Sequence, residues 1–323
     1  MRAFQVTDTD VAPHLAEIAV PEPAAGEVRI RVAACGLNFA DTLLASGRYQ
    51  QRPALPFTLG MEIAGTIDAL GEGVSHPPLG ARVAVVGTTG GLAELATVAA
   101  DQCLMLPDEI GFEEAAALQI TYMTSHLALL RRARLQRGET LLVTGAAGGV
   151  GLTAVEIGKL AGARVIAVAR GAERLAAAQS AGADHLIDSD GSDLKAALRA
   201  LGGVDVAYET IGGDMFMQAL GAMRPEGRIL TIGYAGGTIP QIPANLLLVK
   251  NVAVIGLYFA NYASFCPSAL RDAQAEILAW RAAGLIKPHI SHVLPLARAA
   301  QALALLKDRK STGKVVVRCD APA

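Results

Sequence analysis

A glycine-rich run joins a short apolar segment to a helical pattern near the middle of the chain. Residues 140–144 are apolar or β-branched, residues 145–151 include four glycines, and residues 152–161 have the apolar spacing of a helix. A second apolar segment follows at 164–169. Strand, glycine-rich turn, helix and strand within about thirty residues predict a parallel unit that binds a dinucleotide, because glycines let backbone N–H groups approach a pyrophosphate.

The residue that follows the second strand indicates which dinucleotide is bound. An NAD-binding Rossmann unit has Asp or Glu about twenty residues after the glycines, where it accepts a hydrogen bond from the ribose 2′-hydroxyl. This chain has Arg170 at that place and Arg174 one helical turn later. A guanidinium cannot accept from a hydroxyl, but it donates well to a 2′-phosphate. The sequence therefore predicts NADPH as the cofactor.

Length and composition exclude several classes of protein. A chain of 323 residues exceeds one ordinary hydrophobic core, which predicts two domains, and 18% charged residues is typical of a folded globular protein. A net charge of −2 gives no basis for binding nucleic acid or an anionic membrane. The apolar runs are too short for a transmembrane helix, the N-terminus does not resemble a signal peptide, and the four cysteines are scattered like free thiols. We therefore expect a cytoplasmic protein.

The pattern of the chain changes twice along its length. The first hundred or so residues predict short strands, of which 27–32 alternates polar and apolar side chains. From residue 112 helical and strand patterns alternate, which predicts a parallel sheet with helices on both faces. The last part returns to the first style. We expect an α/β protein in which a doubly wound Rossmann sheet, residues 116–260, is inserted in a β-rich domain made of 1–115 and 261–323.

Short motifs along the whole chain resemble one known family. They lie at 38–47, 60–65, 113–117, 145–151, 181–185 and 311–315. In this order they resemble the medium-chain dehydrogenase/reductase superfamily, specifically its zinc-free quinone oxidoreductase branch. The resemblance covers essentially all of the sequence and implies a GroES-like fold for the β-rich domain.

The resemblance also implies a site without zinc. Alcohol dehydrogenases of the superfamily have a Cys and a His ligand at the positions of Asn38 and Met61 in this chain. Amide and thioether groups are poor zinc ligands beside thiolate and imidazole. Without a Lewis acid to stabilise an alkoxide, we expect the hydride to reach a quinone or a carbon–carbon double bond conjugated to a carbonyl.

Two residues of the first domain are candidates for the chemistry. Tyr49 follows the helix that begins after Asn38, in a place similar to that of a tyrosine in mitochondrial-type enoyl reductases. Its phenol either protonates the α-carbon of an enone, donates to a quinone oxygen, or only lines the cleft. Asn38 either caps the helix or donates its amide near the nicotinamide ribose and the substrate, and both roles are compatible.

Further cofactor-binding residues are predicted from the family and from the carboxyl ends of the expected strands, where an open α/β sheet binds its ligand. The resemblance implies that Thr124 contacts the nicotinamide end and that Arg309 reaches the adenosine phosphate. Bacterial members often have Asn-Tyr where this chain has Asp188 and Ser189, so we expect weaker adenine packing. The predicted set is Asn38, Thr124, Gly145, Ala147, Gly148, Gly149, Val150, Arg170, Arg174, Thr210, Ile232, Gly233, Tyr234, Phe259 and Arg309.

Two other functions remain open from the sequence. One is an enoyl-thioester reductase, which needs a basic groove for coenzyme A, and no run of Lys and Arg indicates such a groove. The other is a non-catalytic, crystallin-like protein that binds NADPH. The presence of Asn38, Tyr49 and the glycine-rich run favours catalysis.

Residues 251–256 are apolar and contain no charge or proline, which predicts a homodimer through pairing of two such strands.

Overall fold

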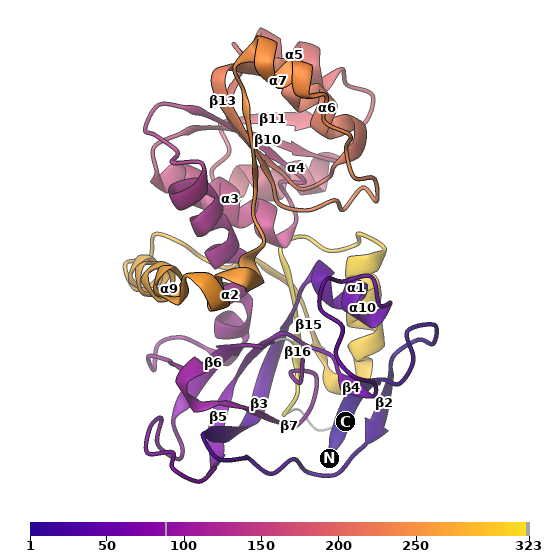
Figure 1. The fold of residues 1–323 in the computed structure, drawn as a ribbon, viewed down its shortest axis with the longest axis vertical. Helices are drawn as coiled ribbons and strands as arrows, with labels where there is room; N and C mark the ends of the chain where they lie inside the picture. Colours follow the sequence, from indigo (N-terminus) through magenta and orange to yellow (C-terminus); the bar gives the residue numbers. More distant parts are fainter. Residues whose placement is uncertain (88, 321–323) are drawn as a thin grey trace. The chain divides into compact units, whose positions relative to one another are not determined.

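The structure, a computed structural model, describes residues 1–87 and 89–320 and forms two compact units (Figure 1). Unit 1 comprises Met1–Ile120 and the segment from Ile290 onwards, and unit 2 comprises Thr121–His289. The chain therefore returns to unit 1 at Ile290, later than the expected boundary at 261.

Unit 1 is organised around β3 (Glu27–Leu37), which alternates buried apolar residues with partly exposed ones over its first half. The larger sheet has the order β15-β16-β3-β5-β6-β8, and β7 also pairs with β3. A smaller sheet has the order β2-β1-β4. The other strands of unit 1 are β1 (Arg2–Val6), β2 (His14–Glu17), β4 (Phe57–Thr58), β5 (Glu62–Leu70), β6 (Arg82–Val86), β7 (Leu95–Ala99), β8 (Leu104–Met105), β15 (Ile290–Pro295) and β16 (Lys314–Arg318).

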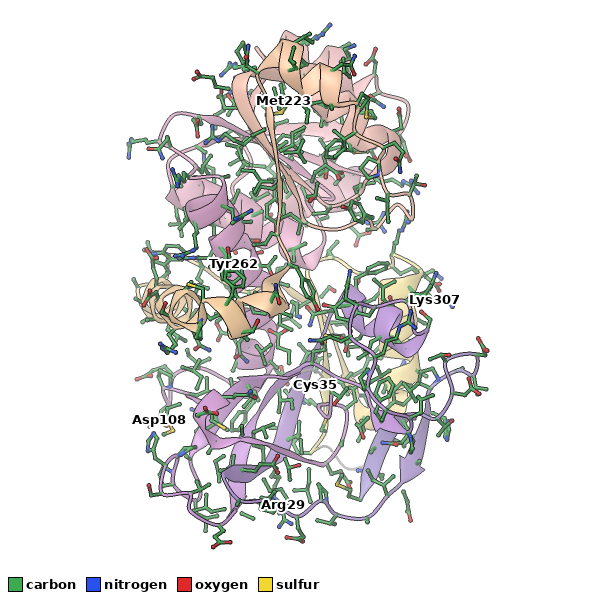
Figure 2. All side chains as sticks on the ribbon, in the orientation of Figure 1. Arg29, Cys35, Asp108, Met223, Tyr262 and Lys307 are labelled. Atoms are coloured by element: carbon green, nitrogen blue, oxygen red, sulfur yellow. The ribbon has the colours of Figure 1, made fainter. Side chains whose placement is uncertain are left out.

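The helices of unit 1 pack on these strands at close range. A Cβ atom at Gly36 would lie 1.8 Å from the Ala116 carbonyl oxygen, so glycine is required where α2 meets β3. The core of this unit includes Cys35, labelled in Figure 2 and fully buried. The helical segments are α1 (Phe39–Ala45), η1 (Ala100–Gln102), α2 (Phe112–His126, which continues into unit 2), η4 (Leu296–Arg298) and α10 (Ala299–Lys307).

Unit 2 is a parallel sheet in the order β11-β10-β9-β12-β13-β14. The chain winds outward from β9 in both directions, so the strand order reverses between β9 and β12, the place where such sheets bind ligands. The α/β prediction is confirmed. The strands are β9 (Thr140–Thr144), β10 (Arg164–Ala169), β11 (His185–Asp188), β12 (Val204–Glu209), β13 (Met223–Thr231) and β14 (Ala253–Gly256).

Helices cover the sheet of unit 2 and bury apolar side chains such as Phe216 and Met223, the latter labelled in Figure 2. They are η2 (Leu127–Arg132), α3 (Gly149–Leu160), α4 (Ala172–Ser180), α5 (Leu194–Ala200), α6 (Gly213–Ala222), α7 (Ala244–Lys250), η3 (Phe259–Asn261), α8 (Tyr262–Phe265) and α9 (Pro267–Ala282). In residues 1–87 and 89–320, no helix has the length and apolar character needed to cross a membrane.

Packing explains why the boundary lies at Ile290. Tyr262, Ala269 and Ala273, from α8 and α9, form one buried cluster with Leu127 of unit 2. The helical pattern of 268–283 corresponds to α9, whose buried Ala269 and Ala273 pack within unit 2. Residues 112–132 form one continuous helical stretch, in which α2 passes directly into the π-helical turn η2.

Candidate active site

The predicted nucleotide-binding residues of unit 2 gather at one edge of the parallel sheet. Gly145 follows β9, Arg170 follows β10, Thr210 follows β12 and Ile232 follows β13. Because these strands are parallel neighbours, their carboxyl ends lie together at one edge of the sheet. The structure therefore brings these residues to a common edge.

Two positions in the glycine-rich turn require glycine. Gly145 has a φ of +60°, and a Cβ there would lie 2.5 Å from Thr210 Oγ1. A Cβ at Gly151 would lie 2.3 Å from the Gly145 carbonyl oxygen. Helix α3 starts at Gly149, and its N-cap, Gly148, has no side chain that could accept from the first N–H groups. This end of α3 therefore fits an anion such as a pyrophosphate.

Thr210 has a structural task that its position in the sequence did not indicate. Its Oγ1 donates to the Thr144 carbonyl at 2.8 Å, and its N–H donates to Thr144 Oγ1 at 3.0 Å. Beside it, the Glu209 carboxylate accepts from Thr144 Oγ1 and from the N–H groups of Ile211 and Gly212. Burial raises the pKa of Glu209. These bonds join the ends of β9 and β12 under the glycine-rich turn.

Charges of both signs meet at the predicted 2′-phosphate position. Arg170 Nε lies 3.1 Å from Asp190 Oδ1, and the two side chains are 61% and 64% exposed. Asp188 Oδ1 accepts from the N–H groups of Gly171 at 3.2 Å and Asp190 at 3.0 Å. The N–H groups of Asp190 and Gly171, together with the charge of Arg170, lower the pKa of Asp188. Arg174 Nη1 lies 3.5 Å from the Arg170 carbonyl oxygen, a long contact one helical turn away.

The other predicted residues of unit 2 differ in exposure. Thr124 is buried on α2, and the Ile232 N–H donates to the Glu209 carbonyl at 2.9 Å. Tyr234 is exposed. Phe259 begins η3 and packs against the cluster that includes Tyr262.

In unit 1, the Asn38 side chain is held by two buried charges. Lys314 Nζ donates to Asn38 Oδ1 at 2.9 Å, and Asn38 Nδ2 donates to Glu62 Oε2 at 3.1 Å. Lys314 Nζ also lies 2.8 Å from Glu62 Oε2, and the Lys and Glu side chains are 4% and 0% exposed. The two charges orient the amide, because its oxygen faces the ammonium and its NH₂ group faces the carboxylate.

Glu62 connects three segments of unit 1. Its Oε1 accepts from the N–H groups of Gln119 at 2.8 Å and Ile120 at 3.1 Å. Its Oε2 accepts from Asn38 Nδ2 and Lys314 Nζ. A buried carboxylate is tolerated where a cation and several donors satisfy it. The sequence did not lead us to Glu62 and Lys314, although they lie in the family motifs at 60–65 and 311–315. The available signal was a charged residue at the start of a strand whose next three residues are Gly or apolar, in β5 and in β16.

Asp41 completes this polar cluster at the start of α1. Its Oδ2 accepts from the Asn38 N–H at 2.7 Å, as an acidic residue in the first turn of a helix does. Asn38 therefore is a helix N-cap, and its side chain has the further contacts described above. Burial raises the pKa of Asp41 to about 6, while the nearby charge of Lys314 opposes that shift.

Tyr49, Met61 and Arg309 also belong to unit 1. Tyr49 is half-buried and packs against the hydrophobic core just after α1. Met61 is buried in that core, so its thioether is surrounded by apolar side chains. Arg309 is exposed after α10 and has a φ of +56°. In the described part of the chain, no three His, Cys, Asp or Glu residues are grouped so that they could hold a metal ion.

Comparisons with known proteins agree with this architecture. Residues 24–108 match the model of the alcohol dehydrogenase GroES-like domain, and residues 149–275 match that of the zinc-binding dehydrogenases. Quinone oxidoreductase-like protein 2 of Bos taurus is 39% identical over 97% of this chain and 87% of its own. The quinone oxidoreductase of Thermus thermophilus, solved also with NADPH, is 34% identical and has a TM-score of 0.86 over 98% of this chain and 100% of its own. The Escherichia coli quinone oxidoreductase complexed with NADPH is 28% identical and has a TM-score of 0.91 over the same shares.

Proposed function

This chain belongs to the quinone oxidoreductase branch of the medium-chain dehydrogenase/reductase superfamily, and from that premise we propose that it is an NADPH-dependent, zinc-independent reductase. Its substrates are quinones or α,β-unsaturated carbonyl compounds. The observation that carries the proposal is the edge of the unit 2 sheet, where the glycine-rich turn and Arg170 lie at neighbouring strand ends. Relatives with this fold have been crystallised with NADPH.

The residues present fit that cofactor. The first N–H groups of α3 bind the pyrophosphate, because Gly148 leaves them open and Gly145 and Gly151 keep Cβ atoms out of the turn. The guanidinium groups of Arg170 and Arg174 bind the 2′-phosphate. When bound, NADPH supplies a hydride from its nicotinamide ring.

Zinc independence is supported by the two residues at the ligand positions. The amide of Asn38 is engaged by Lys314 and Glu62, and Met61 lies in the hydrophobic core. Neither group is placed or suited to bind Zn²⁺. Metal analysis of the purified protein and activity after chelator treatment test this point. Stoichiometric zinc whose removal abolishes turnover would contradict it.

Tyr49 and Asn38 of unit 1 act on the substrate that accepts the hydride. Reduction of an enone needs a proton at the α-carbon, and Tyr49 donates it from its phenol. A reduced quinone oxygen takes its proton from water, so it depends less on this donor. Asn38 donates its amide near the substrate, in an orientation that Lys314 and Glu62 hold constant.

A comparison of substrates tests the proposed function. NADPH absorbance is followed after addition of a small quinone, an enone or an enoyl thioester, each at the same concentration. We expect oxidation with the first two acceptors and slower oxidation when NADH replaces NADPH. Turnover with the thioester alone would favour an enoyl-thioester reductase. NADPH binding without turnover on any acceptor would favour a non-catalytic NADPH-binding protein.

We further propose that the protein forms a homodimer through β14. This strand lies at one end of the parallel sheet, so one side of it offers backbone N–H and C=O groups to another chain. Helix α7, which leads into β14, exposes Leu248 by 76% and Val249 by 66%. Two such edges paired about a twofold axis satisfy each other. Light scattering is expected to give about twice the chain mass of 33.3 kDa, and a stable monomer would contradict the proposal.

A further inference from the structure

Around the first turn of α4, at the predicted 2′-phosphate position, acidic side chains outnumber basic ones. Arg170 and Arg174 supply positive charge, while Asp188, Asp190 and Glu173 supply negative charge around the first turn of α4. A site that selects a phosphate is expected to be positive overall. The acids therefore need an explanation, because they oppose the group that Arg170 is expected to bind.

Asp190 is held beside Arg170 by the turn that follows β11. Asp188 Oδ1 accepts the N–H of Asp190 at 3.0 Å and that of Gly171, which precedes α4, at 3.2 Å. Ser192 Oγ donates to the Asp188 carbonyl at 2.5 Å. These bonds fix the start of the turn to the start of α4, and the Asp190 carboxylate then lies 3.1 Å from Arg170 Nε. The backbone of Asp190 is therefore held near Arg170, although its exposed carboxylate can turn away.

We propose that Asp190 is a specificity-determining residue for the nicotinamide cofactor, because its carboxylate occupies Arg170 in the place of the 2′-phosphate. NADPH must displace Asp190 from Arg170, whereas NADH leaves this ion pair intact. The inference rests on the proposed function, since it assumes that Arg170 binds the 2′-phosphate.

The ion pair is exposed, so displacing it alone costs little affinity. A 2′-phosphate, however, carries a charge of about −1.5 to −2 and must then lie close to the displaced carboxylate. Together these effects weaken NADPH binding by roughly tenfold in a site with an Asp190 side chain, and salt reduces the effect. NADH has no phosphate at this position and does not experience it.

The test measures dissociation constants of NADPH and NADH for the wild type and Asp190→Asn at low and at high salt. The amide keeps the size of the side chain and removes its charge. We expect NADPH affinity to rise roughly tenfold and NADH affinity to change less than about twofold, with a smaller gain at high salt. Asp272→Asn on α9 removes an equal charge from an exposed position and is expected to change neither constant.

A second pair of variants identifies the partner of Asp190. In an Arg170→Ala background, Asp190→Asn is expected to give a smaller gain in NADPH affinity than in the wild type, because only the repulsion between carboxylate and phosphate is then relieved. An equal gain for both nucleotides, a gain that is just as large without Arg170, or no gain in the wild-type background would each overturn the inference. If the wild type binds NADPH and Asp190→Asn has no effect, the inference fails and the proposed function stands. If the wild type binds neither nucleotide, both fail.

Discussion

The two units use charged side chains in opposite ways. In unit 1, Lys314 is 4% exposed and is held by both Glu62 and Asn38. In unit 2, Arg170 is 61% exposed, and its contact is with Asp190, which is also exposed. Both are cations beside a carboxylate at a strand end, but Lys314 is buried in the protein and Arg170 is exposed to solvent.

This difference determines what each charge can control. A buried ion pair acts in a low dielectric and tolerates little displacement, so it fixes the geometry of the groups around it. An exposed pair is screened and contributes little to stability, so it exchanges readily for another anion. Under the proposed function, the buried charges of unit 1 would position reacting groups, and the exposed charges of unit 2 would select the ligand.

Tyr49→Phe is the strongest test of the assignment of chemistry to unit 1. If the phenol is the proton donor, turnover of an enone is expected to fall about 10²–10⁴-fold, as is typical of losing a general acid. Quinone turnover should fall much less, and the NADPH dissociation constant should stay the same. Steady-state kinetics with both substrates and a binding titration check this. Enone turnover within about threefold of the wild type would mean that Tyr49 only shapes the cleft.

Lys314→Met tests whether the stability of the protein depends on the buried ion pair between Lys314 and Glu62. Without the ammonium, the Glu62 carboxylate is buried and uncompensated, so the free energy of unfolding is expected to fall by about 3–5 kcal/mol. Lys307→Met is the matched control, because Lys307, labelled in Figure 2, is exposed at the end of α10. Its substitution should change stability by less than about 0.5 kcal/mol in urea unfolding. Equal effects of the two variants would contradict the contrast between buried and exposed cations.

Arg170→Ala tests the corresponding claim for unit 2. One charge-assisted hydrogen bond to the 2′-phosphate contributes about 1.5–3 kcal/mol, so the NADPH dissociation constant should rise by one to two decades. NADH binding and thermal stability should change little, since the guanidinium is exposed. A similar loss for both nucleotides, or tighter binding of NADH than of NADPH by the wild type, would contradict the assignment.

Asp41→Asn tests whether a buried carboxyl group of unit 1 makes the stability of the protein depend on pH. Burial raises the pKa of Asp41 from an ordinary 3.8 to about 6, so the folded protein holds a proton that the unfolded chain has lost between these values. The contribution of Asp41 to stability is therefore greatest at low pH and is lost as pH rises through about 6. Relative to the wild type, Asp41→Asn should gain about 1–3 kcal/mol between pH 4.5 and pH 7.5 in urea unfolding. A difference that does not vary with pH would show that Asp41 does not titrate there.

The sequence predicted those parts of the molecule that depend on local patterns. The expected helix 152–161 is α3 (Gly149–Leu160), and the expected strands around the glycine-rich run are β9 and β10, because glycine positions and apolar periodicity specify them locally. The α/β fold is confirmed, and so is the family that the short motifs along the chain resemble.

Contacts between distant segments could not be predicted in this way. Lys314 and Glu62 are 252 residues apart, and no spacing rule connects them. The boundary at Ile290 depends on the packing of Tyr262 against Leu127, which a helical pattern at 268–283 does not indicate. Arg170 could be assigned from its position, but the approach of Asp190 depends on how the turn after β11 folds back to Gly171.

The discontinuous composition of unit 1 has a consequence for biosynthesis. Unit 2 is one continuous stretch, Thr121–His289, and all of it leaves the ribosome before β16 (Lys314–Arg318) does. Until β16 is made, β3 lacks one of its antiparallel neighbours, and Glu62 and Asn38 lack their ammonium partner. Domains generally fold as units in the order in which they are synthesised, but here β3 and Asn38 find their partners only after β16 has been made. The completed Asn38 site thus marks a chain that has been translated through β16 and folded.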